Sequence, residues 1–429
     1  MRYIPLNNSI YKRNRLNFMN QMKGNCMAIF NSNDIYPVSA DSELPFAQHR
    51  DMFHLAGIDQ EETILILYPS SKDSKTREIL FIRRSDEHTK IWEGEKLSKD
   101  LASKLSGIES IHFVEDFKNI LHLITSKVDT FYINKNEHYR ANSPVETRED
   151  RFISWLLKKY PAHKVAKSNP ILQRLRSIKH IDEIDQIRKA CQITKKGFNR
   201  VLKFIKPDIW EYQIEAEFIH EFINNSSKGF AYSPIIASGQ DNNVLHYVKN
   251  NKQCKDGELI LMDVGAEYGN YSSDMTRTIP VSGHFSKRQK EIYNTVLRVK
   301  NEATKLLTVG NNWKNFHDQV GEIMTKELLD VNLLDKADIK NQTKKNPAYK
   351  KYFMHGTSHH LGLDTHDYGL LEDIFQENMV FTVEPGIYIP EEGFGVRLED
   401  DVVIQNKGEP INLMEDIPIE TDHIEELMN

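Results

Sequence analysis

The 429-residue sequence has few cysteines, no long apolar run and no cluster of basic residues. Its three cysteines, Cys26, Cys191 and Cys254, lie far apart, which argues against both a disulfide framework and a thiolate metal site. No segment approaches the roughly 18 apolar residues of a membrane-spanning helix, and the N-terminus lacks the apolar stretch of a signal peptide. We therefore expect a cytoplasmic protein in a reducing compartment, with no membrane partner.

The charge balance and the length are those of an ordinary globular protein. A formal net charge of -6 argues against a nucleic-acid partner, and a hydrophobic content of 39% is enough for a sizeable core. A chain of this length favours two domains, and Asn169-Pro170 is the candidate boundary. We predict a smaller α/β domain over residues 1–172, with a hairpin loop at 69–75, and a second domain over residues 173–429.

The second domain is expected to combine helices with a largely antiparallel sheet, an α+β arrangement. Apolar residues at helical spacing predict four helices, whose stripes begin at Ile184, Ile214, Ile292 and Phe316. Ser286 and Gln289 form a capping-box pattern before the third helix. The segments that read as strands are 258–266, 274–282, 379–389 and 395–404. The polar, lysine-rich stretch 330–350 reads as a surface loop.

Four acidic residues interrupt these apolar strand-like segments: Asp263, Asp274, Glu384 and Glu399. A carboxylate removed from water costs several kcal/mol or more unless a counter-charge pairs with it. Arg397 is the only obvious basic partner nearby in sequence, so we infer a divalent metal. Asp400 and Asp401 are expected to be solvent-facing or structural.

A histidine-rich segment, residues 355–367, lies between the two acidic pairs. One imidazole with four carboxylates makes an oxygen-rich site, which does not match a structural zinc site. Mn²⁺ suits such ligands best, with Zn²⁺, Co²⁺ and Fe²⁺ as alternatives. Five protein ligands exceed the needs of one ion, so we predict two ions that share bridging carboxylates and activate a bridging water for hydrolysis.

Taken together, these motifs resemble the aminopeptidase P (Xaa-Pro aminopeptidase) branch of the pita-bread metallopeptidases. The matching strings are MDVGAEY at 262–268, SDMTRT at 273–278, HGTSH at 355–359, VEPGIY at 383–388 and VRLEDD at 396–401. Segments 39–46 and 50–57 resemble that family's first domain. The resemblance implies a C-terminal pita-bread (creatinase/aminopeptidase) catalytic domain that releases the first residue from peptides with proline second.

The resemblance also assigns the metal ligands. It implies Asp263, Asp274, His359, Glu384 and Glu399, with Asp274 and Glu399 bridging the two ions. Glu384 would further act as general base toward the bridging water and pass the proton to the leaving proline nitrogen. His359 completes the family's His-Gly-X-Ser-His string; a register error of one residue would make His360 the ligand instead.

Five side chains are implied on the substrate side. His246 and His366 match substrate-side histidines, of which His366 positions the carbonyl and the developing oxyanion. Arg397 matches the arginine that supports the metal site and the substrate. His355 matches a wall of the proline pocket, and Tyr388 is assigned to substrate binding.

The resemblance implies a homodimer or homotetramer, in which positions like Asp41 and Trp92 can reach a neighbouring subunit's site. The nearest alternative is a prolidase, which uses the same fold and metals on Xaa-Pro dipeptides. A methionine aminopeptidase is disfavoured because those chains usually lack such a first domain. From another class, a metal-free pita-bread binding protein is disfavoured because all five ligands are present.

Overall fold

The computed structural model describes residues 2–138, 140–141 and 143–429. The chain divides into two compact units. Pro5–Arg176 forms the N-terminal unit, and Ser177–Asn429 forms the C-terminal unit together with the chain's first residues up to Ile4. The division falls at the end of helix α8 (Asn169–Ser177), four residues beyond the boundary placed between 172 and 173 from the sequence.

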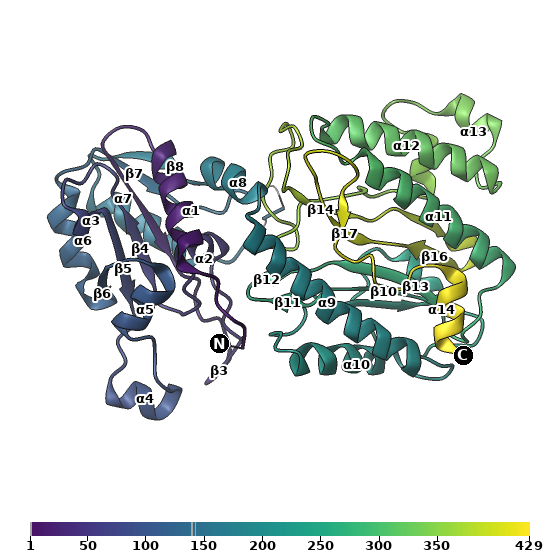
Figure 1. The fold of residues 1–429 in the computed structure, drawn as a ribbon, viewed down its shortest axis with the longest axis horizontal. Helices are drawn as coiled ribbons and strands as arrows, with labels where there is room; N and C mark the ends of the chain where they lie inside the picture. Colours follow the sequence, from purple (N-terminus) through teal and green to yellow (C-terminus); the bar gives the residue numbers. More distant parts are fainter. Residues whose placement is uncertain (1, 139, 142) are drawn as a thin grey trace. The chain divides into compact units, whose positions relative to one another are not determined.

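The N-terminal unit is an α/β domain built on a six-stranded mixed sheet with the order β6-β5-β4-β1-β7-β8 (Figure 1). The strands are β1 Cys26–Asn31, β4 Ile64–Leu67, β5 Glu78–Ile82, β6 Ser110–Phe113, β7 Thr130–Ile133 and β8 Lys164–Lys167. Strands β4 and β5 pair antiparallel, as the predicted hairpin requires, and the short helix α3 (Ser74–Arg77) lies in their connection. A separate two-stranded ribbon, β2 Pro37–Ser39 and β3 Ser42–Glu43, is fully exposed.

Helices cover both faces of this sheet. Alternate residues of β1 point to opposite faces, so Ala28 and Phe30 join the core that contains Phe18 of α1, whereas Met27 and Ile29 join the other core. The remaining helices of the unit are α2 Arg50–Ala56, α4 Glu87–Glu93, α5 Lys99–Ser106, α6 Phe117–Thr125 and α7 Arg148–Lys159, with α1 spanning Asn8–Gln21. The sheet is thus buried on both faces.

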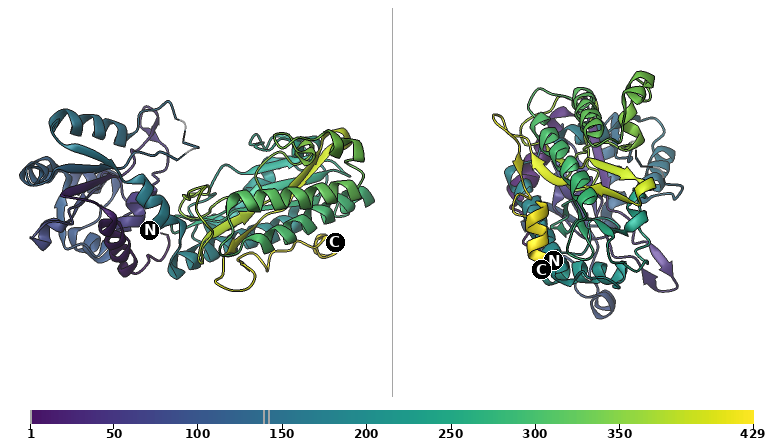
Figure 2. Two further views of the ribbon diagram at one scale, coloured as in Figure 1. Left: turned by 90° about the horizontal axis from the view of Figure 1, so that it is seen from above. Right: turned by 90° about the vertical axis from the view of Figure 1, so that its right-hand side faces the viewer.

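All four helices predicted for the C-terminal unit are present. They are α9 Ile181–Phe204, α10 Glu211–Asn224, α11 Lys287–Leu306 and α12 Trp313–Asp330; α13 Lys336–Asn341 and α14 Thr421–Met428 complete the set. Helices α9 and α11 run along the same side of the strands (Figures 1 and 2). Within the described ranges, no helix of either unit is both long and apolar enough to cross a membrane.

Strands of the C-terminal unit belong to several small antiparallel sheets. These are β13-β10-β9, β14-β17-β18, the hairpin β15-β16 and the ribbon β11-β12. Their bounds are β9 Ile235–Ser238, β10 Leu259–Val264, β11 Glu267–Tyr268, β12 Tyr271–Ser272, β13 Met275–Pro280, β14 Val380–Val383, β15 Gly386–Ile389, β16 Phe394–Arg397, β17 Asp400–Val403 and β18 Ile411–Asn412. The antiparallel α+β expectation is confirmed.

The prediction of continuous strands over 379–389 and 395–404 is wrong. The first segment breaks between β14 and β15, and the second breaks between β16 and β17. Pro385, which has no backbone N–H to donate to a ladder, lies at the first break. Glu384 and Glu399 occupy the two breaks, where the chain leaves one sheet for another.

One further expectation needs correction. The stretch 330–350 contains helix α13, which Asp335 and Asp338 cap reciprocally, so it is not simply a loop. Of the two alternatives for Asp400 and Asp401, burial of both side chains excludes the solvent-facing one and agrees with a structural role. The Arg277 guanidinium lies 2.6 Å from Asp400, and Lys300 also pairs with it. Burial alone would raise the pKa of Asp400, but these two cations hold it well below its usual range.

We expect the cap of α11 to contribute measurably to stability. The Ser286 hydroxyl accepts the Gln289 backbone N–H at 3.2 Å, and the Gln289 side chain accepts the Ser286 N–H at 2.8 Å. Ser286→Ala should lower the free energy of unfolding by about 0.5–2 kcal/mol, measured by urea unfolding followed by far-UV circular dichroism. Ser286→Thr, which keeps the hydroxyl, is the control; equal midpoints for both variants would contradict the assignment.

Candidate metal centre

The first two predicted ligands lie on neighbouring strand ends. Asp263 belongs to β10 and stands opposite Thr276 of β13 in the antiparallel register. Asp274 lies just before β13, is 4% exposed, and its backbone N–H donates to Asp401 at 3.0 Å. The antiparallel pairing therefore brings both carboxylates to the same end of this sheet.

Tyr232 joins the two carboxyls. Its hydroxyl lies 2.6 Å from Asp263 Oδ1 and 2.5 Å from Asp274 Oδ1. A phenol has one proton to donate, so hydrogen bonds to both require one carboxyl to carry a proton. Burial and the charge of Asp263 raise the pKa of Asp274 well above its usual range, which agrees with that requirement.

Glu399 and Arg397 come from the second half of the unit. The Thr276 hydroxyl donates to Glu399 at 2.6 Å, and Glu399 is 1% exposed. The Arg397 guanidinium donates to Asp263 at 2.6 Å and to the Tyr388 hydroxyl at 2.9 Å. Thr276 and Arg397 thus hold acidic residues from both halves of the unit in one cluster.

His359 is oriented toward these carboxylates. Its Nδ1–H donates to the His360 carbonyl at 3.0 Å, because a carbonyl can only accept. The other ring nitrogen, Nε2, lies 3.4 Å from Asp274 and 3.8 Å from Glu384. An imidazole whose Nδ1–H is held by a carbonyl presents Nε2 as a ligand, the arrangement usual for metal-binding histidines.

His360 has a different environment. Its ring lies 4.5 Å from that of Phe381 and 5.6 Å from that of Trp313, between ring centroids. A Cβ on Gly369 would come within 1.9 Å of His360 Nε2, so the ring is closely packed on that side too. In the described parts of the chain, the ligand atoms of Asp274, His359 and Glu399 lie within 4.8 Å of one another, and His360 is not in that group.

The centre carries more negative charge than the surrounding side chains offset. Burial is the main cause that raises the pKa of Asp274 and Glu399 well above the usual range, and neighbouring carboxylates add to it. Burial also raises the pKa of Glu384 to about 7, although its side chain remains 20% exposed. The Arg397 guanidinium contacts the cluster through its hydrogen bond to Asp263. Such a donor set fits divalent metal ions.

The predicted substrate-side residues surround this cluster. The His355 Nδ1–H donates to the Gly356 carbonyl at 2.7 Å, so its Nε2 accepts the Tyr388 hydroxyl at 2.7 Å, and Tyr388 in turn accepts from Arg397. Burial, followed by the charge of Arg397, lowers the pKa of His355 to about 3, and burial raises that of Tyr388 to about 12. Burial and the charge of Arg397 therefore keep the His355 imidazole neutral.

The two remaining histidines are exposed. The His366 ring lies 4.4 Å from that of His359, centroid to centroid, and meets it edge to face. His246 contributes to the lowered pKa of His355 through its charge, which places it within electrostatic reach of that side chain.

Sequence reasoning missed two residues of the centre. Thr276 lies inside one of the matching strings, but nothing in its local pattern indicated the bond to Glu399. Tyr232 lies outside every matching string, and its contact with Asp263 and Asp274 depends on a loop that packs from 31 and 42 residues away. Asp401, which accepts from Cys191 and from the Asp274 backbone, is a third supporting group.

Comparison with known proteins agrees with this geometry. Residues 185–406 match the model of metallopeptidase family M24, and residues 11–132 match that of the aminopeptidase P N-terminal domain. The Xaa-Pro aminopeptidase of Escherichia coli K12 is 32% identical over 97% of both chains. Human Xaa-Pro aminopeptidase 3 is 32% identical over 92% of this chain and 79% of its own. A zinc-substituted E. coli aminopeptidase P in complex with product aligns with a TM-score of 0.89 at 30% identity, covering 99% of each chain.

The raised pKa of Glu384 predicts a pH-dependent stability difference in chelator-treated protein. Its carboxyl has an unfolded pKa near 4.5 and a folded pKa of about 7, so its stabilising contribution is complete below pH 4.5 and is lost as pH rises through 7. Glu384→Gln keeps the neutral form. It should therefore exceed the wild type in stability by an amount that grows over this range to about 1–3 kcal/mol.

Thermal unfolding midpoints measured from pH 4 to pH 8 check this expectation. The exposed Glu391→Gln is the matched control and should follow the wild-type profile. A stability difference between Glu384→Gln and the wild type that is constant over the range, or that shrinks with rising pH, would contradict the raised pKa.

Proposed function

Because the chain belongs to metallopeptidase family M24, we propose that it is an Xaa-Pro aminopeptidase, which removes the first residue of peptides with proline second. The observation that carries this proposal is the buried cluster of Asp274, His359 and Glu399, with ligand atoms within 4.8 Å and too little positive charge beside it. The aminopeptidase P N-terminal domain and the Xaa-Pro aminopeptidase relatives favour this activity.

We propose that Asp263, Asp274, His359, Glu384 and Glu399 would together hold two divalent ions. The donor set of four carboxylates and one imidazole favours Mn²⁺, with Zn²⁺, Co²⁺ or Fe²⁺ as alternatives. When bound, the ions would supply Lewis-acid catalysis and a water nucleophile at neutral pH. The shortage of positive charge at the centre supports this assignment.

Glu384 is suited to move protons during the reaction. A general base must lie within reach of the water whose proton it takes, and the Glu384 side chain remains 20% exposed beside the cluster. Its partly exposed carboxylate at the strand break can take a proton from the attacking water. It can then deliver that proton to the proline nitrogen, which leaves as a secondary amine.

Two groups of side chains are suited to orient the substrate. One is the hydrogen-bonded series Arg397, Tyr388 and His355, and the other is the pair of exposed histidines, His246 and His366. Arg397 and Tyr388 hold the neutral imidazole of His355 in a fixed position, where its ring can form one wall of a proline pocket. His366, edge-on to His359, can donate to the substrate carbonyl oxygen as charge develops on it. His246 would contact the substrate close to the nucleophile.

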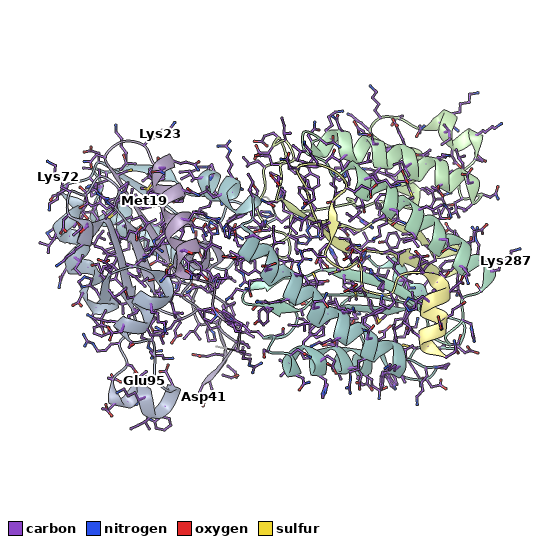
Figure 3. All side chains as sticks on the ribbon, in the orientation of Figure 1. Met19, Lys23, Asp41, Lys72, Glu95 and Lys287 are labelled. Atoms are coloured by element: carbon purple, nitrogen blue, oxygen red, sulfur yellow. The ribbon has the colours of Figure 1, made fainter. Side chains whose placement is uncertain are left out.

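The oligomeric state and the cellular location remain predictions. Trp92 of α4 is 75% exposed, so it is not a core residue of the N-terminal unit, and Figure 3 shows Asp41 at the exposed β2-β3 ribbon of the same unit. Both can contact another subunit in a homodimer or homotetramer. The three cysteines are buried and unpaired, which is consistent with the reducing, cytoplasmic setting expected from the sequence.

The proposed activity predicts a specific substrate preference. Protein loaded with Mn²⁺ should release the first residue from a free-amino Xaa-Pro-Xaa tripeptide, and a chelator should abolish the release. Liquid chromatography of the products with the matching Xaa-Pro dipeptide as the second substrate separates the alternatives. Cleavage of the dipeptide alone would make the chain a prolidase; cleavage of neither by metal-loaded protein would contradict proline specificity.

The different environments of the adjacent histidines predict different effects on metal binding. His359→Ala should lose at least one of the two ions, because it removes the imidazole that faces the carboxylates. His360→Phe, which keeps an aromatic ring between Trp313 and Phe381, is the control and should retain both ions. The readout is metal content, measured by plasma emission spectrometry after dialysis. The opposite pattern would place the ligand at His360. Retention of both ions by both variants would show that neither imidazole is a required ligand.

A further inference from the structure

A large cavity adjoins the metal centre on the side of α12. Its volume is about 1050 Å³, just above the roughly 300–1,000 Å³ of pockets that hold drug-sized ligands. It lies among α12, the segment from 342 to 354 and the strip His355–Gly356–Thr357. Helices α12 and α13 form the outer edge of the C-terminal unit in this region (Figure 1).

The cavity has an apolar floor and a basic rim. Leu329, Phe353 and Met354 contribute apolar surface. We call the exposed lysines Lys326, Lys344 and Lys350 the lysine rim. The other charged lining residues are Lys314 and Asp318, which pair with each other at 2.7 Å, and Glu322; four lysines against two carboxylates leave a net charge of +2.

The cavity shares a wall with the centre. Thr357 lines the cavity, and its carbonyl accepts the backbone N–H of Glu384 at 2.7 Å. His355 also lines the cavity, and its ring lies 3.9 Å from the Glu384 carboxylate. One residue of extended peptide spans about 3.3–3.6 Å, so a peptide held at Glu384 can extend past His355 toward the cavity.

Charge determines which end of a peptide can enter. The lysine rim repels a free α-ammonium and attracts a carboxylate. The first residue must then lie at the centre, with the rest of the peptide running toward α12. His317, also in the lining, is kept neutral by burial, which lowers its pKa, so it does not add to the positive charge.

We propose that this cavity binds the residues that follow proline, and that the lysine rim selects peptides that carry a carboxylate there. That carboxylate is either the C-terminus of a short peptide or an aspartate or glutamate side chain in a longer one. The proposal rests on the proposed Xaa-Pro aminopeptidase activity, and it adds a substrate class that the metal centre does not define.

Two matched peptide pairs distinguish the sources of the carboxylate. The first pair is Ala-Pro-Ala-Ala as the free acid and as the C-terminal amide. The second is Ala-Pro-Ala-Glu and Ala-Pro-Ala-Gln, both as amides. The expected kcat/KM ratio of charged to neutral peptide is about three- to tenfold in one or both pairs, and it should fall toward one as salt is raised. A ratio of one in both pairs at low salt would overturn the proposal.

Lysine variants assign the preference to this cavity. The triple variant Lys326→Gln, Lys344→Gln, Lys350→Gln removes the charge of the rim and nearly retains side-chain length, so the charged-to-neutral ratio should drop to about one. Lys345→Gln is the matched control, because Lys345 neighbours Lys344 in sequence and is exposed but does not line the cavity. An unchanged ratio in the triple variant, or an equal drop in the control, would overturn the proposal.

Product binding tests the rim separately from the activity. Isothermal titration into metal-loaded protein compares Pro-Ala-Glu amide with Pro-Ala-Gln amide, and Pro-Ala-Ala as the free acid with its C-terminal amide. At least one pair should show the same three- to tenfold preference, lost in the triple variant. If no Xaa-Pro peptide is cleaved but this preference is found, the proposed function fails and the carboxylate-binding cavity stands. Equal binding within both pairs would overturn the cavity proposal, whatever the activity.

Discussion

Uncompensated negative charge at the metal centre is the constraint on which the rest of the C-terminal unit depends. Asp274 and Glu399 are almost fully buried, yet Arg397 is the cation that directly contacts the cluster, through Asp263. Carboxylates in such a position stay ionised only when a strong counter-charge is supplied. The hydrogen bonds from Tyr232 and Thr276 orient these groups but add no charge. The fold thus holds its ligands in a state that favours cation binding.

A second network, in which protein cations neutralise the buried carboxylate, supports this cluster. Arg277 donates to the carbonyls of Thr276 and Glu399 and to the Asp400 carboxylate, which Lys300 also contacts. Because Asp400 follows Glu399 directly, this pairing fixes the backbone that carries a ligand. The two adjacent carboxylates therefore differ in function. Protein cations neutralise Asp400, whereas Glu399 is available to bind an external cation.

The sequence allowed the helices and the acidic cluster to be predicted, since both depend on local patterns. Apolar stripes at helical spacing located α9 to α12, and carboxylates inside apolar runs identified the candidate ligands. The breaks at Glu384 and Glu399 were missed, because an apolar run does not show where a strand changes its partner. Tyr232 was missed because its contact with Asp263 is long-range. Burial of Asp400 depends on Arg277 and Lys300, and Asp401 accepts from Cys191 and the Asp274 backbone. These partners come from other elements and leave no trace near residue 400.

The two strand breaks have a consequence for how such a chain can change. Side chains alternate along a strand, so inserting one residue into β14 or β16 would turn every following side chain to the other face and misplace Glu384 or Glu399. The outer wall of the cavity, by contrast, includes side chains from residues 342–350, a segment outside every strand, so its length affects no strand register. A change of length in this segment would therefore alter the shape of the cavity while the arrangement of the ligands stays the same.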